Sequence, residues 1–573
     1  MGVRGRVLIN RVGLAPGAVA LLRAGALIAA AVADCAAQPF PAPDRLPDAR
    51  PSLPAFQTPA QPSLSLPPLP PVPEDGQLSG QSKVFVRRIV VEGHTVLSAG
   101  DLRALVAPFE GREVSAGELQ ELRRRLTLHY IERGYISSGT LLPDQSVQDG
   151  VIRFQVVEGD LSAIDVATDG RLAPGYVAGR IRLGTGAPLN LAQLQERLRI
   201  LQQDRLIESI NAELRPGAAP GESRLAVEVK EAQALEAGVG LNNQRSPSVG
   251  ANRFEAYAAH RNAGGRGDAL EARYGRTRGL TDYALAYALP LNAADTQIAL
   301  RLSASEALVV ESPFRPLDIR SKSATHALAL TQPLLRTASD RLALGAAFER
   351  RSSDTSLLGQ PFSFSPGIPD GSSRSSAWRY SLEWQRRTAD EVLALRLALL
   401  DGRTNAGPKV GGAGPDPAFM VAQLQLQWAR RISRTAGQVL VRVDAQETGH
   451  ALMAQDKLGI GGVATVRGYR ENLLLRDRGQ IVSLEYRYPL ASSDLGGDSL
   501  QLALFFDRGR GTNHDPAPTL PQSISSVGGG ILWNPSRSVQ MQLQYGRALR
   551  TVATPTRDMA DRGVHFALAY QFF

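Results

Sequence analysis

The sequence predicts two small α+β domains followed by an all-β transmembrane barrel of about sixteen antiparallel strands. Three observations predict this fold. The chain begins with a basic and then apolar segment, it contains an internal repeat of about 75 residues, and its last 340 or so residues alternate apolar with polar positions. The repeat carries the periodicity of helices between short strands, whereas the alternation has the period of two that belongs to β-strands.

Composition limits what the chain can do. At 573 residues it is longer than one hydrophobic core usually serves, so several domains are expected. After the N-terminus no run of about 18 apolar residues could cross a bilayer as a helix, so a membrane crossing would use strands. The net charge of +9 is spread along the chain without a basic cluster, and we expect no nucleic-acid partner. The single cysteine excludes an intrachain disulfide.

Residues 1–33 are predicted to be a secretory signal peptide. Arginines precede an apolar stretch over residues 24–33, which ends on an Ala-x-Ala cleavage signal. Cys35 follows closely, but Asp34 stands where lipidation needs a small residue, so we expect no lipid anchor. Residues 34–82 hold a proline every few positions, which predicts an extended linker rather than a domain.

The two repeat units are predicted over residues 83–158 and 159–232. Each reads as a strand, a helical stretch and a closing pair of strands, which is the pattern of a small α+β domain. In the first unit, Tyr135-Ile136 and residues 151–157 are expected to be the strands that close the sheet.

Helix starts are marked in both units. Ser98 is placed to cap a short helix, and Ser115 with Glu118 has the spacing of a capping box for a longer one. In the second unit a helix is expected to begin at Asn190, with Gln193 in the position of the box partner.

Residues 233–573 are predicted to form the barrel. In hydrocarbon every backbone polar group must be satisfied internally, so strands can cross only as a closed barrel. A soluble β-sandwich would also alternate. Against it, the strands are long, carry Trp and Tyr near their ends, and follow a signal peptide; the chain also closes on an aromatic strand. The apolar face of two typical runs consists of Trp378, Tyr380, Leu382 and Trp384, and of Val539, Met541, Leu543 and Tyr545.

No catalytic motif is visible. None of the seven histidines is spaced as a metal-binding pair on a helix, and neither a G-x-S-x-G elbow nor a phosphate-binding loop occurs. We therefore expect no enzyme activity, no cofactor and no metal site. A protease or phospholipase built in a barrel would gather its residues from distant strands, so that alternative stays open.

The informative motif is Val466-Arg467-Gly468-Tyr469. It lies in a glycine-rich connection of about 30 residues between two predicted strands. Connections of that length in a compact domain are usually functional or disordered.

A second motif, Phe505-x-Asp507-x-Gly509, lies on a strand that follows the long connection. Alternation along this strand directs Leu504 and Phe506 outward, so Phe505 and Asp507 face the lumen. An inward carboxylate needs a partner.

Together, V-R-G-Y on a loop, F-x-D-x-G on a later strand, the two α+β repeats and the barrel resemble the outer-membrane transporters of two-partner secretion. These form the haemolysin/haemagglutinin secretion-activation (TpsB) family within the superfamily of barrels with POTRA domains. The likeness runs from about residue 83 to the end, and residues 132–136 and 140–145 are similar to the family's first POTRA domain.

The resemblance implies that the long loop folds back into the barrel and that Arg467 meets Asp507. An arginine fork can bond a carboxylate in bidentate fashion and so fix a loop that would otherwise be mobile. Gly468 would permit a tight turn, and Tyr469 would pack against the wall. The alternative is that Arg467 is a solvated lumen charge and Asp507 pairs with an arginine of a neighbouring strand.

The resemblance also implies a function: export of one large secreted exoprotein, of adhesin or haemolysin type, across the bacterial outer membrane. The POTRA domains, in the periplasm, would recognise the N-terminal secretion domain of this partner, and the lipid-embedded barrel would form the pore. An insertase for other barrels and a diffusion channel are the alternatives. The candidate recognition residues are Arg123, Arg124, Tyr135, Ile136 and Arg197, and the alternative for the arginines is a solvated helix face.

Relatives often carry a helix before the first POTRA domain that plugs the pore. The proline-rich segment here does not favour such a helix. A short one would have to lie near Leu46 or Phe56.

Overall fold

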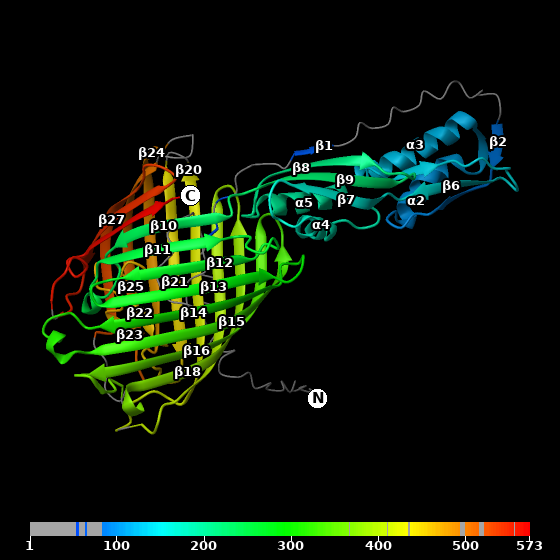
Figure 1. Cartoon of the computed structure of the whole chain (residues 1–573). Helices are drawn as coiled ribbons and strands as arrows, with labels where there is room; N and C mark the ends of the chain where they lie inside the picture. The colour runs from blue at the N-terminus through cyan, green and yellow to red at the C-terminus, as the bar shows by residue number, and fades with distance from the viewer. Residues whose placement is uncertain are drawn as a thin grey trace, which may run out of the picture.

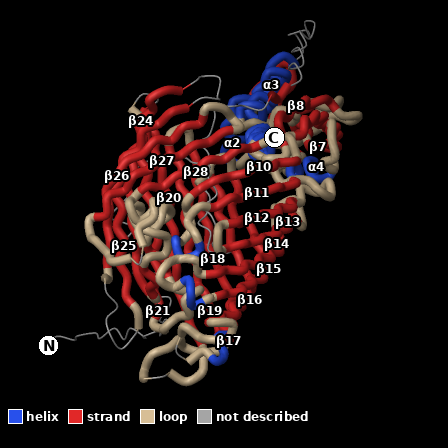
Figure 2. Tube along the Cα trace, turned by 60° about the vertical axis from the view of Figure 1, so that its left-hand side comes forward, coloured by secondary structure: helices blue, strands red, loops and turns tan. Residues whose placement is uncertain are grey.

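The protein consists of a wide cylinder of strands and an elongated α+β arm that leaves one end of it (Figure 1). The computed structural model describes residues 53, 54, 56, 63–65 and 83–572, except 366, 410, 434, 435, 493–498, 515–520 and 555. The predicted signal peptide, Leu46 and most of the predicted linker lie outside these residues. Figure 2 shows the long helices gathered in the arm, while the cylinder is built from strands and loops with a few short helical turns.

The first unit of the arm is a three-stranded sheet packed against two helices. Strand β3 (Arg88–Glu92) pairs in parallel with β6 (Val151–Val157), and β5 (Gly139–Leu141) pairs antiparallel with β6 on its other side. Helices α2 (Ala99–Val106) and α3 (Ala116–Glu132) bury their apolar stripes on this sheet. A separate pair is formed by β2 (Lys83–Val86) and β4 (Arg112–Ser115).

The second unit repeats this topology. Strand β7 (Asp160–Thr168) pairs in parallel with β9 (Glu222–Glu231), and β8 (Ile207–Pro216) pairs antiparallel with β9. Helices α4 (Pro174–Arg182) and α5 (Leu191–Gln202) pack on the sheet. The short β1 (Ser63–Ser65) adds to the β8 edge in parallel. The shared topology confirms the internal repeat.

The predicted helix starts are confirmed. The Ser115 hydroxyl accepts from the amide of Glu118, and the Glu118 carboxylate accepts from the amide of Ser115 at 2.8 Å, which is a complete capping box. The Ser98 hydroxyl accepts from the amide of Asp101 to cap α2, and the Asn190 side chain accepts from the amides of Ala192 and Gln193 to begin α5.

One expectation about the units is wrong, and one helix was not predicted. Tyr135-Ile136 is not a strand but part of a turn: Gly134 takes a positive φ of 88°, and the amide of Tyr135 bonds back to the carbonyl of Tyr130 at the end of α3. The strand that closes the sheet is β5. Helix α4 was missed because Pro174, Gly175 and Gly179 weaken its sequence signal.

In the described part of the chain the barrel has sixteen antiparallel strands, each joined to the next in sequence, and it closes where β10 pairs with β28. The predicted number is confirmed. A two-residue piece, β17 (Gln360–Pro361), extends the hairpin end of β16. The sixteen strands are β10 (Leu235–Asn242), β11 (Arg253–His260), β12 (Ala269–Arg276), β13 (Leu280–Pro290), β14 (Gln297–Leu308), β15 (Arg320–Arg336), β16 (Asp340–Leu357), β18 (Ser372–Arg387), β19 (Glu391–Thr404), β20 (Ala418–Ser433), β21 (Gly437–Thr448), β24 (Arg478–Ser492), β25 (Ser499–Thr512), β26 (Ser523–Asn534), β27 (Val539–Ala548) and β28 (Val564–Gln571).

The barrel wall has an apolar outer face and a polar inner face. On β18, Trp378 and Tyr380 are half exposed outside, while Arg379 between them is buried and donates inward to Glu349 at 2.8 Å. This is the arrangement of a wall between lipid and a wet lumen. None of the helices in the described residues is both long and apolar enough to span a membrane.

The second unit is seated on the short turns at one end of the barrel. Arg180 of α4 is buried there, stacks over Tyr176 at 3.4 Å and donates to Asp295 in the β13–β14 turn. Glu196 of α5 accepts from the amide of Ala338 in the β15–β16 turn at 2.6 Å. The end of the barrel with the short turns is therefore the end that carries the arm, and the connection between β21 and β24 begins at the opposite end.

The N-terminal segment also reaches the barrel. Leu53 and Phe56 pack against inward side chains near the end that carries the arm, and the Arg431 guanidinium lies 4.0 Å over the Phe56 ring. Neither residue is helical.

Candidate functional site

The long connection between β21 and β24 (residues 449–477) folds into the barrel lumen. A small hairpin of β22 (Leu458–Ile460) and β23 (Leu474–Arg476) narrows it to a tip that holds the V-R-G-Y motif. Val466, Arg467 and Tyr469 are each at most 5% exposed. The motif is thus enclosed by the wall rather than open to solvent.

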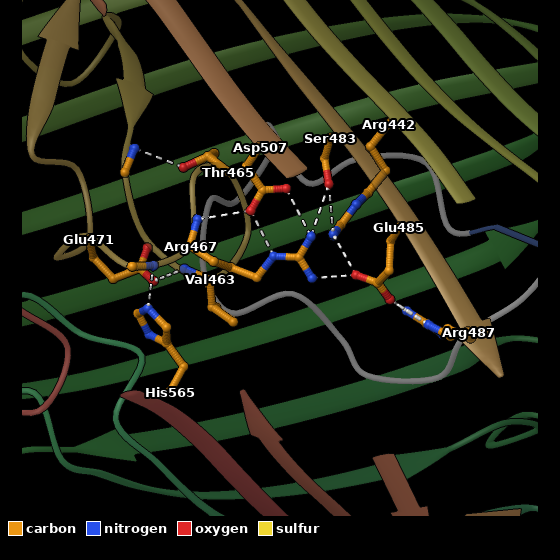
Figure 3. Close-up of polar contacts among 12 residues, drawn as sticks. Arg442, Val463, Thr465, Arg467, Glu471, Ser483, Glu485, Arg487, Asp507 and His565 are labelled. Carbon is orange, nitrogen blue, oxygen red and sulfur yellow. Dashed lines mark hydrogen bonds and ion pairs between the residues drawn. The ribbon is translucent and has the colours of Figure 1, made fainter. Parts of the chain in front are cut away.

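Arg467 forms a bidentate ion pair with Asp507 of β25 (Figure 3). Its Nε and Nη2 donate to the two carboxylate oxygens of Asp507, both at 2.8 Å, and its own amide donates to Oδ2 at 3.0 Å. Directly across the ladder from Asp507 stand Ser483 and Ser526, so no strand arginine faces it from an opposite position. In the structure the partner of Asp507 is the loop arginine.

A second carboxylate completes the site. Glu485 of β24 accepts from Nη1 of Arg467, and the hydroxyl of Ser483 accepts from Nη2 at 3.1 Å. Arg487 and Arg442 flank Glu485 on its other sides (Figure 3). Sequence reasoning missed Glu485, although it alternates with outward residues on a predicted strand and so was readable as an inward carboxylate.

Arg467 is held on its face as well as at its edges. The ring of Phe505 lies 3.5 Å from the guanidinium carbon, in cation–π contact. Gly509, two residues beyond Asp507, makes room for the loop: a Cβ there would lie 2.2 Å from Ile460 and 3.1 Å from Val466. The F-x-D-x-G motif therefore presents three features to the loop: the ring of Phe505, the carboxylate of Asp507 and the space left by the missing side chain at Gly509.

The turn at Gly468 requires glycine. Its φ is +87°, and a Cβ would lie 2.5 Å from the carbonyl oxygen of Gly546 on β27. Its amide donates to Nε2 of His565 on β28 at 3.0 Å. The loop tip thus contacts strands on both sides of β26.

Tyr469 and Val466 anchor the tip through apolar packing. They belong to a buried cluster with Ile460, Leu474, Ile481 and Ile524. The Tyr469 hydroxyl donates to the carbonyls of Ser525 and Arg550, at 3.0 and 2.9 Å. Tyr469 therefore lies against the wall and the β27–β28 connection.

Arg470, directly after the motif, ties the loop to two outer connections. It is bonded to Asp561 in the β27–β28 connection at 2.6 Å and to Glu311 in the β14–β15 connection at 3.0 Å. Farther along the loop, Asp456 accepts from Arg351 of β16 at 2.8 Å. These anchors, which sequence reasoning missed, join segments far apart in the chain.

The electrostatics keep Arg467 charged. Burial alone would lower the pKa of its guanidinium, but the carboxylates of Glu485 and Asp507 outweigh burial and raise that pKa. Removing one partner of such a buried pair typically costs about 3–5 kcal/mol, because the other charge is left without compensation. The arrangement is built to hold a loop, and its polar groups are engaged with one another rather than set out as nucleophile and base. The described residues contain no cluster of potential metal ligands.

The structure does not bring the predicted recognition residues of the arm together on one exposed surface. Arg124 is exposed and paired with Glu121, while Arg123 and Arg197 are half-buried. Tyr135 stacks edge-on against Tyr130, and Ile136 packs against the core of the second unit. Their role in binding stays a prediction.

Two family models match parts of the chain. Residues 221–531 match the family model described as haemolysin secretion/activation protein ShlB/FhaC/HecB. Residues 84–159 match the model of the ShlB-type POTRA domain.

Individual relatives are distant but extensive. The outer membrane transporter CdiB of Escherichia coli O6:K15:H31 (strain 536 / UPEC) is 24% identical over 422 residues, 71% of this chain and 69% of that protein. The heme/hemopexin transporter protein HuxB of Haemophilus influenzae (strain 86-028NP) is 21% identical, covering 78% and 80%. Among solved structures, CdiB from Escherichia coli superposes with a TM-score of 0.64 at 22% identity, covering 88% of this chain and 94% of that one.

Proposed function

The chain belongs to the haemolysin secretion/activation family ShlB/FhaC/HecB, and from that premise we propose that it exports one large exoprotein of adhesin or haemolysin type. It is an outer-membrane transporter of two-partner secretion, with the α+β units in the periplasm and the barrel as the pore. The proposal adds the kind of cargo, its recognition through an N-terminal secretion domain, and the role of the loop in opening the path.

The observation that carries the proposal is the enclosed Arg467. Its bonds to Asp507 and Glu485 hold the tip of a 29-residue connection inside the lumen, where the loop narrows the path that a cargo would take. We infer that export requires this tip to keep its position while the rest of the loop shifts. A transporter for a protein needs no catalytic step, and free energy for export would come from folding of the cargo outside.

Secretion assays test the role of the loop. Arg467→Ala is expected to reduce secretion of the cognate exoprotein strongly and to change channel conductance, while the barrel still inserts. The matched control is Arg508→Ala, since Arg508 is next to Asp507 in sequence but exposed on the outer face. Normal secretion by Arg467→Ala would return Arg467 to the role of an ordinary lumen charge.

Recognition by the arm needs its own test. Deletion of residues 83–232 should abolish secretion while leaving the barrel inserted, and continued secretion would refute recognition by the two units. We expect the partners to be the exoprotein and outer-membrane lipid, and not nucleic acid, because the +9 charge is dispersed along the chain.

An insertase remains the second candidate, because the fold also superposes on BamA from Haemophilus ducreyi lacking POTRA domains 1–3, with a TM-score of 0.50 at 14% identity. Depletion of the chain separates the two functions. Loss of unrelated barrels from the outer membrane would favour the insertase, whereas loss of one secreted protein favours export.

A further inference from the structure

The outer face of the barrel carries a hollow on the side formed by β15, β16, β18 and β19. Its volume is about 530 Å³, and its lining is almost wholly apolar. Strands β16 and β18 run side by side there, as Figure 1 shows. The residues that rim it on the lipid-facing side are Leu330, Leu344, Tyr380, Leu382, Leu397 and Leu399.

The hollow exists because one outward position is small. Ala346 lies directly between Leu330 and Tyr380 in the ladder, and its methyl group leaves a depth that the larger neighbours surround. Gly345, adjacent to it, adds no side chain on the inner side. A depression bounded by leucines in a lipid-facing wall is a place where an acyl chain packs with more contact than on a smooth face.

An aromatic pair and then a basic row, made of His326, Arg350 and Arg403, lie above the hollow, toward the outer end of the barrel. Phe348 and Trp378 face each other across the ladder, with ring centroids 5.2 Å apart. Two residues farther along β16, Arg350 stands directly opposite His326 of β15, and both side chains are exposed. From Ala346 to Arg350 is about 13 Å along the strand.

Among the described residues no carboxylate neutralises Arg350. Within the described residues it makes no ion pair or side-chain hydrogen bond, whereas the other basic side chains beyond it are paired: Lys322 with Glu306 and Arg374 with Asp354. Arg403, exposed on β19, lies across from Ser376, which in turn faces Arg350. The one outward carboxylate in this stretch of β19 is Asp401, opposite Trp378.

We propose that the hollow and the basic row form a binding site for a phosphorylated lipid of the outer leaflet. The acyl chain would occupy the hollow over Ala346, and the phosphate would accept hydrogen bonds from Arg350 and His326. Aromatic side chains such as Phe348 and Trp378 are typical of the membrane interface, which places Arg350 at the level of lipid headgroups. Arginine is suited to this contact because its planar fork matches phosphate geometry.

The wall favours a lipid over a peptide in this place. Both β16 and β18 are hydrogen-bonded on their two sides, so no free strand edge is available for a peptide backbone. A free phosphate ion could bind Arg350 and His326 but would not occupy the apolar hollow. The two halves of the site together therefore fit a molecule with an anionic head and an apolar tail.

Native mass spectrometry of the detergent-purified full chain tests the site, with lipid A as the probe and the dephosphorylated glycolipid of the same acyl chains as comparison. The full chain should retain lipid A. Arg350→Ala and Ala346→Phe should each weaken retention about tenfold, the first by removing the phosphate contact and the second by filling the hollow. Matched controls lie on β12, where Arg276→Ala and Ala272→Phe make the same exchanges at exposed outward positions away from the hollow and should change nothing.

Each other outcome overturns the proposal. Equal retention of lipid A and of its dephosphorylated form would show that phosphate is not recognised. Competition by inorganic phosphate together with normal binding by Ala346→Phe would identify a free-anion site instead. Unchanged binding by Arg350→Ala, in a variant whose heat-modifiable mobility shows a folded barrel, would remove the arginine from any site.

Discussion

Arg467 in the barrel and Arg124 in the first unit make the same chemical contact in opposite surroundings. Each donates through Nε and Nη2 to both oxygens of one carboxylate, Asp507 for the first and Glu121 for the second. The Arg467 side chain is 1% exposed, and that of Arg124 is 48% exposed. The difference teaches that geometry alone does not make a bond important; burial of both partners does.

Asp507→Ala should have the largest effect. It leaves Arg467 buried with only Glu485 to compensate it, at a cost of about 3–5 kcal/mol to the seated loop. Hydrogen exchange in the full chain should show faster exchange across residues 461–473. Exchange as slow as in the unaltered chain would mean that Glu485 and the apolar cluster hold the tip without Asp507.

Gly468→Ala should have the next largest effect. It tests how the loop tip fits against the barrel wall without changing a charged residue. The methyl group would lie 2.5 Å from the carbonyl oxygen of Gly546, and the residue would keep a positive φ, so we expect a cost of about 2–3 kcal/mol. Secretion should fall while Arg467 is intact. Gly479→Ala, at another barrel glycine with a close neighbour but away from the tip, separates a local effect from general damage to the wall.

Tyr469→Phe should cost less, about 1 kcal/mol, since it removes one hydroxyl that donates to two carbonyls while the ring stays packed. Channel recordings should show more frequent openings of the loop. If the variant behaves like the unaltered chain, the apolar cluster and Arg467 alone keep the loop tip in the lumen.

In the arm, Glu158 is a hydrogen-bonded carboxylate whose contribution to stability depends on pH. Burial alone would raise the pKa of this carboxyl, but hydrogen bonds from Thr95, Tyr130 and Val96 outweigh burial and keep it below the usual 4.5. Its contribution to stability is therefore present above that value and lost as the pH falls through the lowered pKa. Glu158→Gln should speed exchange at residues 94–96 at neutral pH, and the difference from the unaltered chain should vanish in acid. A difference that persists in acid would contradict this.

Arg124→Ala should have the smallest effect, below about 0.5 kcal/mol, because an exposed pair on one helix is screened by water. A thermal melt of the full chain should not resolve it. A secretion defect with unchanged stability would show instead that Arg124 contacts the exoprotein.

Whether a feature could be predicted from the sequence depends on how far apart in the chain its residues lie. The capping box of Ser115 and Glu118 and the alternation on β18 depend on near neighbours, and both were predictable. The bond of Arg467 to Asp507 spans 40 positions and was reached only through resemblance. The bond of Arg470 to Glu311 spans 159 positions and has no local signal, so only the closed barrel brings the two together.

Glu485 lies between these extremes. Alternation marks it as inward, but the choice of its partner depends on the register between β24 and β25 and on where the loop tip descends. Helix α4 was missed for a different reason: tertiary packing against β7 stabilises a segment whose proline and glycines oppose helix formation.

The most direct test of the account is a double-mutant cycle of Arg467→Ala and Asp507→Ala, read out as the amount of cognate exoprotein secreted. If the two residues act as one lock, the double variant should secrete at least as much exoprotein as the single variant that secretes less. The reason is that the bond between the two residues can be lost only once. Losses that multiply would show that the two residues act separately and would contradict the lock.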